Sequence, residues 1–160
     1  MKPIVSNKNT KCQIIGILED GLQSLSQQAI DYLKNADLLI GSQRFMDAIQ
    51  GLLKDEVKKQ EFSGKIMQVP NWVQTALEQN KQVVVLATGD PLCHGIGSFL
   101  VKKLGIENCH LLPNLTMFQV AFSRLGQAWQ GVKISSIHGK DTGEWSINAP
   151  FEHGVRLVLA

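Results

Sequence analysis

The chain has 160 residues, of which 44% are hydrophobic and 19% charged, a composition that indicates a folded globular protein and excludes a disordered or fibrous one. Its 16 basic and 14 acidic side chains leave a formal net charge of +2, which gives no reason to expect nucleic acid or an anionic membrane as the main partner. The sequence contains no stretch of about 18 apolar residues, so we expect no transmembrane helix. The N-terminus lacks the apolar segment of a signal peptide, so we expect no such peptide.

The cysteines and histidines are few and scattered. Cys12, Cys93 and Cys109 form no C-x-x-C pair, so their spacing predicts neither a disulfide framework nor a zinc finger. We expect three reduced, mostly buried thiols in a cytoplasmic protein. The four histidines form no H-E-x-x-H or comparable cluster, so we expect no metal site.

The first part of the chain alternates short apolar runs with amphipathic stretches. The apolar run CQIIGIL reads as a buried strand, and the apolar residues that follow it recur at helical spacing. Ser24 or Ser26 is suited to cap the N-terminus of that helix, and Gly41-Ser42 forms the turn into the next one. The predicted elements are strand 12–18, helix 25–36, strand 37–40, helix 43–53 and a weak strand 57–62.

The second part repeats the same alternation. Pro70 opens a helix, and the continuous β-branched run QVVVLA predicts a parallel strand that is covered on both faces. Gly105 and Gly126 are placed to end two further helices. The predicted elements are a helix from residue 70 through 77, strand 82–87, helix 96–104, strand 109–112, helix 115–125, strand 132–137 and strand 155–159.

This alternation predicts an α/β fold with a mainly parallel sheet flanked by helices. The rhythm changes after Gly126, where two strands are separated by about fifteen polar, turn-rich residues. We therefore predict an N-terminal α/β domain over residues 1–126. Residues 127–160 are predicted to be a linker and the first strands of a truncated second α/β domain, because so short a segment rarely folds alone.

Three loops follow strands of the predicted sheet, and ligands bind beyond the carboxyl ends of such strands. The loops are residues 16–21, residues 88–91 with Gly95 and Gly97, and residues 113–117. Glycines let a ligand approach the backbone, although a Gly-Asp-Pro triplet by itself most often marks a turn. The dinucleotide fingerprint fails because Leu100 stands at its third glycine, and no P-loop motif occurs.

The order of these motifs resembles that of the tetrapyrrole (corrin/porphyrin) methyltransferase family. Within the family the resemblance is to the cobalt-precorrin-7 C5-methyltransferase branch, which also forms the N-terminal half of precorrin-6Y C5,15-methyltransferases. The stretches that carry the resemblance, from about residue 14 to residue 141, are IGILEDGLQSLS, ADLLIGSQRF, VVVLATGDPLCHGIG, LLPNLTMFQVAFSRLGQAWQ and SSIHGKD.

The resemblance implies that S-adenosylmethionine binds in a cleft between the two domains. The family's motifs fall on the turn Glu19-Asp20-Gly21, on the Gly-Asp-Pro turn and on the loop after the fourth strand. Met117 departs from the small hydroxyl residue usual in that loop, which leaves it a backbone contact. The cofactor-binding residues implied in this way are Gly21, Gly89, Asp90, Pro91, Ile96, Thr116, Met117 and Ala128, with the strand near Leu159 and Ala160.

The resemblance also implies a tetrapyrrole substrate rimmed with carboxylates, so cations near the cleft are candidate substrate ligands. Those implied are Arg44, His138 and Lys140, with Arg124 as a further cation. The alternative interpretation is a solvated surface charge for Lys140 and Arg124, and a strand-end histidine that satisfies backbone for His138. Phe45 replaces a histidine usual in the branch, and we interpret His94 as loop lining.

The implied activity is methyl transfer from S-adenosylmethionine to C5 of a precorrin macrocycle in cobalamin biosynthesis. The sequence identifies no catalytic residue, and such a transfer needs orientation rather than a nucleophile. The family further implies a homodimer. Two alternatives remain open: a methylase of the same fold that acts on another ring carbon, and a non-catalytic truncated module that dimerises and binds cofactor weakly, which the early chain end at Ala160 favours.

Overall fold

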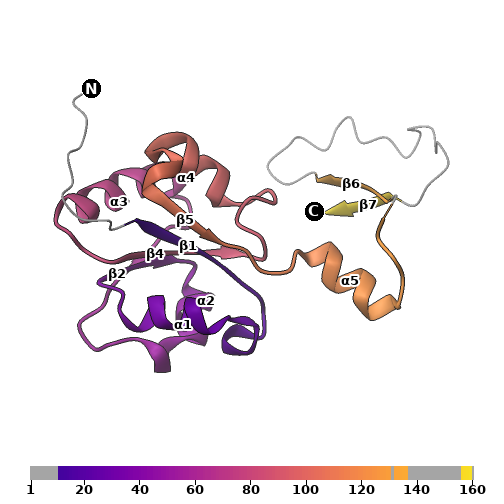
Figure 1. Ribbon diagram of the computed structural model, residues 1–160, viewed down its shortest axis with the longest axis horizontal. Coiled ribbons are helices and arrows are strands. Elements are labelled where there is room, and N and C mark those ends of the chain that lie inside the picture. Colours follow the sequence, from indigo (N-terminus) through magenta and orange to yellow (C-terminus); the bar gives the residue numbers. More distant parts are fainter. Residues whose placement is uncertain (1–10, 131, 137–155, 160) are drawn as a thin grey trace. The chain divides into compact units, whose positions relative to one another are not determined.

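The computed structural model describes residues 11–130, 132–136 and 156–159. The chain divides into two compact units, residues 1–115 and residues 116–160. Figure 1 shows the elements of both along the chain. No helix within the described residues is long and apolar enough to cross a membrane.

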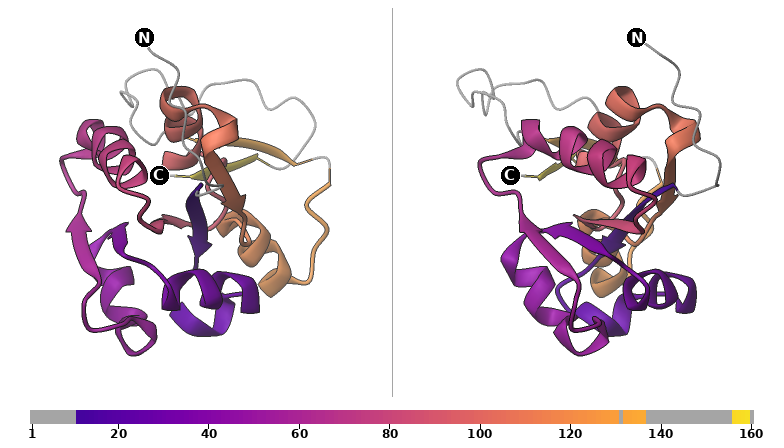
Figure 2. Two further views of the ribbon diagram at one scale, coloured as in Figure 1. Left: turned by 60° about the vertical axis from the view of Figure 1, so that its left-hand side comes forward. Right: turned by 90° about the vertical axis from the view of Figure 1, so that its left-hand side faces the viewer.

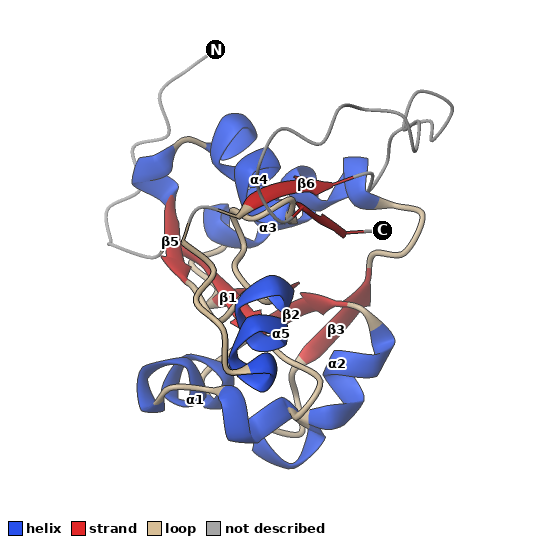
Figure 3. Ribbon diagram, turned by 90° about the vertical axis from the view of Figure 1, so that its right-hand side faces the viewer, coloured by secondary structure: helices blue, strands red, loops and turns tan. Residues whose placement is uncertain are grey.

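A five-stranded, fully parallel sheet forms the centre of the first unit, with the strand order β3-β2-β4-β1-β5. The parallel α/β fold predicted from the sequence is therefore confirmed. Figure 3 shows β3 and β5 at opposite edges of this sheet. The strands are β1 (Cys12–Ile17), β2 (Leu38–Gly41), β3 (Lys58–Glu61), β4 (Val83–Thr88) and β5 (Cys109–Leu112).

Helices cover both faces of the sheet, with α3 and α4 on one face and α1 and α2 on the other (Figures 1 and 2). Ser26 is the residue that caps α1, because its Oγ accepts a hydrogen bond of 3.2 Å from the Ala29 N–H. Gly105 ends α4 with a φ of +86°, as expected of a glycine at that position. The helices are α1 (Gln27–Lys34), α2 (Gln43–Ala48), α3 (Val69–Glu78) and α4 (Ile96–Leu104), with 3-10 turns η1 (Gly21–Ser24), η2 (Gln50–Leu52), η3 (Ile66–Gln68) and η4 (Ile106–Asn108).

One predicted helix is shorter than its apolar spacing suggested. The pattern predicts a single helix over residues 43–53, whereas α2 ends at Ala48 and the chain continues as the 3-10 turn η2. Gly51 lies within that turn, and a glycine disfavours the interior of an α-helix because it loses the most backbone freedom there. Ile49, which follows α2, is nonetheless fully buried, as the apolar spacing predicts.

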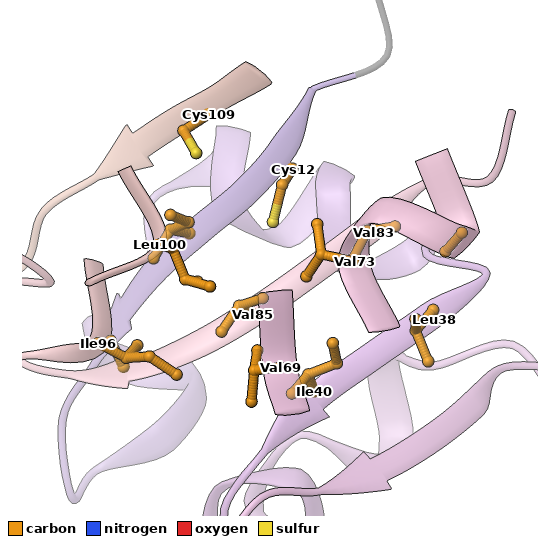
Figure 4. Close-up of a cluster of buried hydrophobic side chains, with 13 residues drawn as sticks. Cys12, Leu38, Ile40, Val69, Val73, Val83, Val85, Ile96, Leu100 and Cys109 are labelled. Carbon is orange, nitrogen blue, oxygen red and sulfur yellow. The ribbon is translucent and has the colours of Figure 1, made fainter. Parts of the chain in front are cut away.

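The core consists of two apolar layers, one on each face of the sheet. Alternate residues of β4 point into opposite layers: Val83 and Val85 contact α3 and α4, and Val84 and Leu86 contact α1 and α2. Figure 4 shows the first layer, in which Leu100 of α4 is fully buried. Burial on both faces explains why β4 reads as a continuous apolar run rather than an alternating one.

The three cysteines are free thiols, as predicted. Cys12 and Cys109 pair in register across β1 and β5 and are both buried in the first layer (Figure 4). Burial raises the pKa of Cys12, and the neighbouring Cys109 raises it further. Burial also raises the pKa of Cys109 to about 11, with Glu107 as a second cause. Both thiols are therefore protonated at neutral pH and pack as small apolar groups.

Asp37 ties the start of β2 to its surroundings. Its Oδ1 accepts a hydrogen bond of 2.7 Å from Lys54 Nζ, and its Oδ2 accepts one of 2.8 Å from the backbone N–H of Gln82. The hydrogen bond from Lys54 is the first cause that lowers the pKa of Asp37, and the one from Gln82 is the second. The carboxylate thus joins β2 to the residue that precedes β4.

The second unit contains α5 (Met117–Leu125) and a two-stranded parallel sheet of β6 (Lys133–Ser136) and β7 (Arg156–Leu159). Thr116 starts α5 with a capping box, in which its Oγ1 accepts from the Gln119 N–H at 3.3 Å and its own N–H donates to Gln119 Oε1 at 2.8 Å. Gly126 ends α5 in the left-handed conformation, with a φ of +63°. The division between the two units precedes α5, and the domain boundary expected at Gly126 stays a prediction.

Leu100→Ala tests the first layer of the core. We expect the free energy of unfolding to fall by about 2–5 kcal/mol, because the substitution removes a buried side chain and leaves a cavity. The measurement is denaturation in urea, followed by circular dichroism. The control is Ile106→Ala, since Ile106 is 59% exposed and its truncation should cost less than about 0.5 kcal/mol. Equal losses for the two variants would contradict this description of the core.

Candidate functional site

The connections that leave β1 and β4 run in opposite directions across the sheet, and we call this change a reversal. These two strands are neighbours, yet the chain leaves β1 through α1 toward β2 and leaves β4 through α4 toward β5, on opposite faces of the sheet. Because the strands are parallel, both loops start at the side of the sheet where the strands have their carboxyl ends. We call this side the carboxyl edge. Open α/β sheets bind ligands in the crevice at such a reversal, so the carboxyl edge is the candidate site.

Three loops meet at Gly16 on this edge. The Gly89 N–H donates to the carbonyl of Ile17 at 3.0 Å, and the Asn114 N–H donates to the carbonyl of Gly89 at 3.3 Å. A methyl group on Gly16 would collide with the Gly89 carbonyl oxygen and would lie 2.8 Å from the Asn114 amide nitrogen. The loops after β1, β4 and β5 can therefore touch only because residue 16 has no side chain.

The loop after β1 is a tight turn around Gly21. Gly21 is buried with a φ of +60°, and its N–H donates to the carbonyl of Leu18 at 3.0 Å. Ser24 closes the turn, because its Oγ accepts from the Leu18 N–H at 3.2 Å and donates to the Gly21 carbonyl at 2.9 Å. Gly21 therefore has a conformational reason to be glycine, and its contact with a cofactor stays a prediction.

The loop after β4 carries the Gly-Asp-Pro turn. Gly89 has a φ of +61°, and the half-buried Asp90 accepts the Leu92 N–H on Oδ1 at 2.8 Å. Pro91 is buried, and its carbonyl accepts the Gly97 N–H at 3.0 Å. Oδ2 of a carboxylate offers further acceptor sites, so the turn presents an acceptor at the edge while its own backbone is held in place.

Helix α4 begins directly after this turn. Its N-cap is Gly95, so the N–H groups of the first turn have no side-chain acceptor at the cap. A Cβ at Gly95 would lie 2.6 Å from the Pro91 carbonyl oxygen, which shows how closely the turn packs on the helix start. The Ile96 side chain is buried in the core, and the contact of Ile96 with a cofactor stays a prediction.

Two further residues in this loop are chemically distinct. His94 is exposed, as expected of loop lining, and has a φ of +55°, which is uncommon for a residue with a side chain. Cys93 is half-buried, and burial raises the pKa of its thiol, with the charge of Asp90 as a second cause. A protonated thiol is a poor nucleophile, so Cys93 is not poised to react.

Arg44 lies on the helix that follows β2 and reaches the loop after β1. Its Nη1 is 2.8 Å from Glu19 Oε1, and its guanidinium lies over the ring of Phe45, 4.6 Å from the centroid. The side chains of Arg44 and Glu19 are 61% and 59% exposed, so this ion pair adds little stability. It does hold the cation at the carboxyl edge, while Phe45 itself is buried in the core.

Exposed leucines line the same edge. Leu22, Leu92 and Leu115 belong to the loops after β1, β4 and β5 respectively, and they are 40%, 52% and 51% exposed. Singly exposed leucines need no explanation, but here each of the three touching loops carries one, which adds apolar surface to this edge. An open pocket of about 300 Å³ between α3 and the strands β2 and β3 includes no residue of these loops.

The remaining predicted site residues belong to the second unit or lie outside the described residues. Thr116 is buried at the N-cap of α5, whereas Met117 is 49% exposed. Ala128 and Arg124 are exposed. The residues that lie outside the described ones are His138, Lys140 and Ala160. Within the described part of the chain, no three His, Cys, Asp or Glu residues are grouped to hold a metal ion.

Gly16 and Asn114 lie in two of the loops that the sequence predicts to bind a ligand, but the sequence predicts no role for either residue. Asn114 Nδ2 donates to the carbonyl of Ser24 at 2.8 Å and to that of Gly16 at 3.3 Å. These partners are 90 and 98 residues away along the chain. No periodicity or motif spacing signals such a contact, because it depends on the order of strands in the sheet.

Gly16→Ala tests whether the three loops need the missing side chain. We expect the free energy of unfolding to fall by about 1–3 kcal/mol or more, because the new methyl group meets backbone that cannot move cheaply. The measurement is urea denaturation. Gly51→Ala is the matched control: nothing lies within 4 Å of its added Cβ, so it should be neutral or stabilising by up to about 1 kcal/mol. A neutral Gly16→Ala would contradict the contact.

Comparison with known proteins places this arrangement in context. The chain is 33% identical over 113 residues to a precorrin-6Y C(5,15)-methyltransferase (decarboxylating) of Mycobacterium tuberculosis, covering 71% of this chain and 28% of that protein. It is 27% identical over 127 residues to a cobalt-precorrin-7 C(5)-methyltransferase of Salmonella typhimurium, covering 79% and 61%. The chain thus spans less than a third of the first relative's length and about three fifths of the second's.

Solved structures share the fold. A uroporphyrin-III-C-methyltransferase from Thermus thermophilus superposes with a TM-score of 0.69 at 16% identity, covering 82% of this chain and 62% of that one. A cobalamin-biosynthesis precorrin-6Y methylase from Archaeoglobus fulgidus gives a TM-score of 0.59 at 19% identity, covering 84% and 68%. The family model of the tetrapyrrole (corrin/porphyrin) methylases matches residues 11–160. Because that match spans most of the sequence, the chain belongs to the tetrapyrrole (corrin/porphyrin) methylase family.

Proposed function

We propose that the chain binds S-adenosylmethionine at the carboxyl edge and serves methyl transfer to C5 of a precorrin macrocycle in cobalamin biosynthesis. The observation that carries the cofactor site is the contact of three loops at Gly16, beside the reversal between β1 and β4. The names of the relatives support the C5 position, since the Mycobacterium and Salmonella proteins are both named for it.

The residues of the carboxyl edge fit the chemistry of this cofactor. Exposed Leu22 and Leu92 suit an apolar nucleoside face, and Asp90 offers a carboxylate oxygen to a hydroxyl or an amine. The first turn of α4 offers N–H groups to a carboxylate, apart from the Gly97 N–H, which already donates to the Pro91 carbonyl. When bound, the cofactor supplies a methyl group activated by a positively charged sulfur. The residues proposed to hold it are Gly21, Gly89, Asp90, Pro91, Ile96, Thr116, Met117 and Ala128.

In the proposed reaction the protein orients its ligands rather than attacking them. Well-oriented reactants can gain about 7–11 kcal/mol over free encounter, and the loops around Gly16 provide a rigid edge for that purpose.

The residues proposed to bind the substrate are positively charged or can become so. Arg44 holds its guanidinium at the carboxyl edge through Glu19, where a carboxylate of a tetrapyrrole can pair with it. His138 and Lys140 are proposed to add to this set. A homodimer and a cytoplasmic location complete the proposal, on the strength of the family resemblance.

Asp90→Ala tests the cofactor site. We expect the Kd for S-adenosylhomocysteine, measured by isothermal titration calorimetry, to rise about tenfold or more, equivalent to about 1.4 kcal/mol for a lost hydrogen bond to a polar ligand. Asp31→Ala is the control, because Asp31 lies exposed on α1 and its carboxylate accepts a local hydrogen bond from Gln27. An unchanged Kd for Asp90→Ala would mean that Asp90 merely shapes its turn.

Methyl transfer tests the activity. We expect the chain to move an isotopically labelled methyl from S-adenosylmethionine to C5 of the precorrin, located in the product by NMR. Arg44→Ala should raise the KM for the precorrin about tenfold, because a charge-assisted hydrogen bond is lost, and should leave the Kd for S-adenosylhomocysteine unchanged. A label on another carbon would show that the chain belongs to a methylase that acts on a different ring carbon. Binding without any transfer would leave a non-catalytic binding module.

A further inference from the structure

The Asn114 side chain links the three loops of the carboxyl edge. Its Nδ2 donates to the carbonyl of Ser24 at 2.8 Å, in the loop after β1, and to the carbonyl of Gly16 at 3.3 Å, in β1 itself. Its Oδ1 accepts the Leu115 N–H at 2.8 Å. Its backbone N–H donates to the carbonyl of Gly89 at 3.3 Å, in the loop after β4. One residue of the third loop thus contacts the other two.

The chemistry of these contacts requires an uncharged amide. Two backbone carbonyls face one end of the side chain and can only accept, so that end must be an NH₂ with two protons to donate. One N–H faces the other end, so that end must be an oxygen. A carboxylate of the same shape would bring a negative charge against two carbonyl oxygens, which disfavours the charged form.

The link continues from Ser24 into the turn that holds Gly21. Ser24 is held through its carbonyl by Asn114, and its Oγ bonds both the Leu18 N–H and the Gly21 carbonyl. On the other side, the Gly89 carbonyl that Asn114 holds directly precedes Asp90. A change at Asn114 therefore reaches both loops to which the cofactor is assigned, although the half-buried Asn114 itself adds no charge to the edge.

We propose that Asn114 is a positioning residue, which holds the loops after β1 and β4 in the geometry that binds the cofactor. This inference rests on the proposed cofactor site. Loops ordered before binding add no ordering cost to the binding free energy. Loss of the amide should therefore weaken cofactor binding through Ser24, Gly16 and Gly89, without removal of any group that touches the cofactor.

Asn114→Asp is the decisive variant. At about pH 8 we expect its Kd for S-adenosylhomocysteine, measured by calorimetry, to be about tenfold above wild type, because the new carboxylate repels the two carbonyls. At about pH 4 the difference should narrow to about threefold or less. The ordinary pKa of an aspartate is about 3.9 and the two carbonyls raise it here, so the new carboxyl becomes protonated and can again donate to a carbonyl. Values are compared as ratios to wild type at each pH, which cancels the titration of groups common to both proteins.

Asn108→Asp is the matched control. Asn108 also donates from Nδ2 to a backbone carbonyl, that of Leu104 at 2.7 Å. It directly precedes β5 and so lies at the amino ends of the strands, away from the carboxyl edge. Its substitution should lower the free energy of unfolding, as we also expect of Asn114→Asp, without a change in the Kd ratio at either pH. Equal effects of the two variants on the Kd, or a loss for Asn114→Asp that does not recover at low pH, would overturn the proposal.

A second readout needs no ligand. Hydrogen exchange at the amides of Leu18 and Gly89 should be faster in Asn114→Asp than in wild type at about pH 8, and unchanged in Asn108→Asp. If wild type fails to bind S-adenosylhomocysteine, the proposed function falls, while faster exchange still shows that Asn114 orders the loops. Unchanged exchange overturns the positioning role. Should Asn114→Asp not fold, Ser24→Ala removes the next link and should raise the Kd without any recovery at low pH.

Discussion

The first unit depends on the close approach of three strand ends at Gly16. Strands β4, β1 and β5 end side by side at one edge, and the loops from the two outer strands meet over the central one. A side chain at Gly16 would collide with the Gly89 carbonyl, so the contact exists because one Cβ is missing. The hydrogen bonds of Asn114 with Gly89 and Ser24 follow from that proximity.

The two apolar layers make this edge rigid. Strand β4 is buried on both faces by α1 and α2 on one side and by α3 and α4 on the other, so the positions of the strand ends cannot drift independently. Loops anchored on such strands suit a reaction that depends on orientation. Methyl transfer from a sulfonium is a reaction of that kind, because the methyl is already activated and the protein need only align donor and acceptor.

The charged groups at the edge complement this rigidity without contributing much to stability. The Arg44–Glu19 pair is exposed, so the guanidinium of Arg44 lies at the carboxyl edge within reach of solvent. Asp90 is fixed by the Leu92 N–H and keeps acceptor capacity. Burial meanwhile raises the pKa of Cys93, so the thiol in the loop after β4 stays protonated. The edge therefore combines the Asp90 carboxylate, the Arg44 cation and a protonated thiol.

The sequence by itself determined the alternation of strands and helices, because burial on one or two faces leaves a period in the apolar residues that β4, α4 and the other elements retain. It also determined the family, since LATGDPL and the stretches around it lie in a specific order. The helix end at Ala48 escaped prediction because apolar spacing continues through a 3-10 turn. Only the tertiary structure decided that Asn114 reaches Ser24 and Gly16, 90 and 98 residues away, because strand order, which local periodicity does not encode, determines which loops meet.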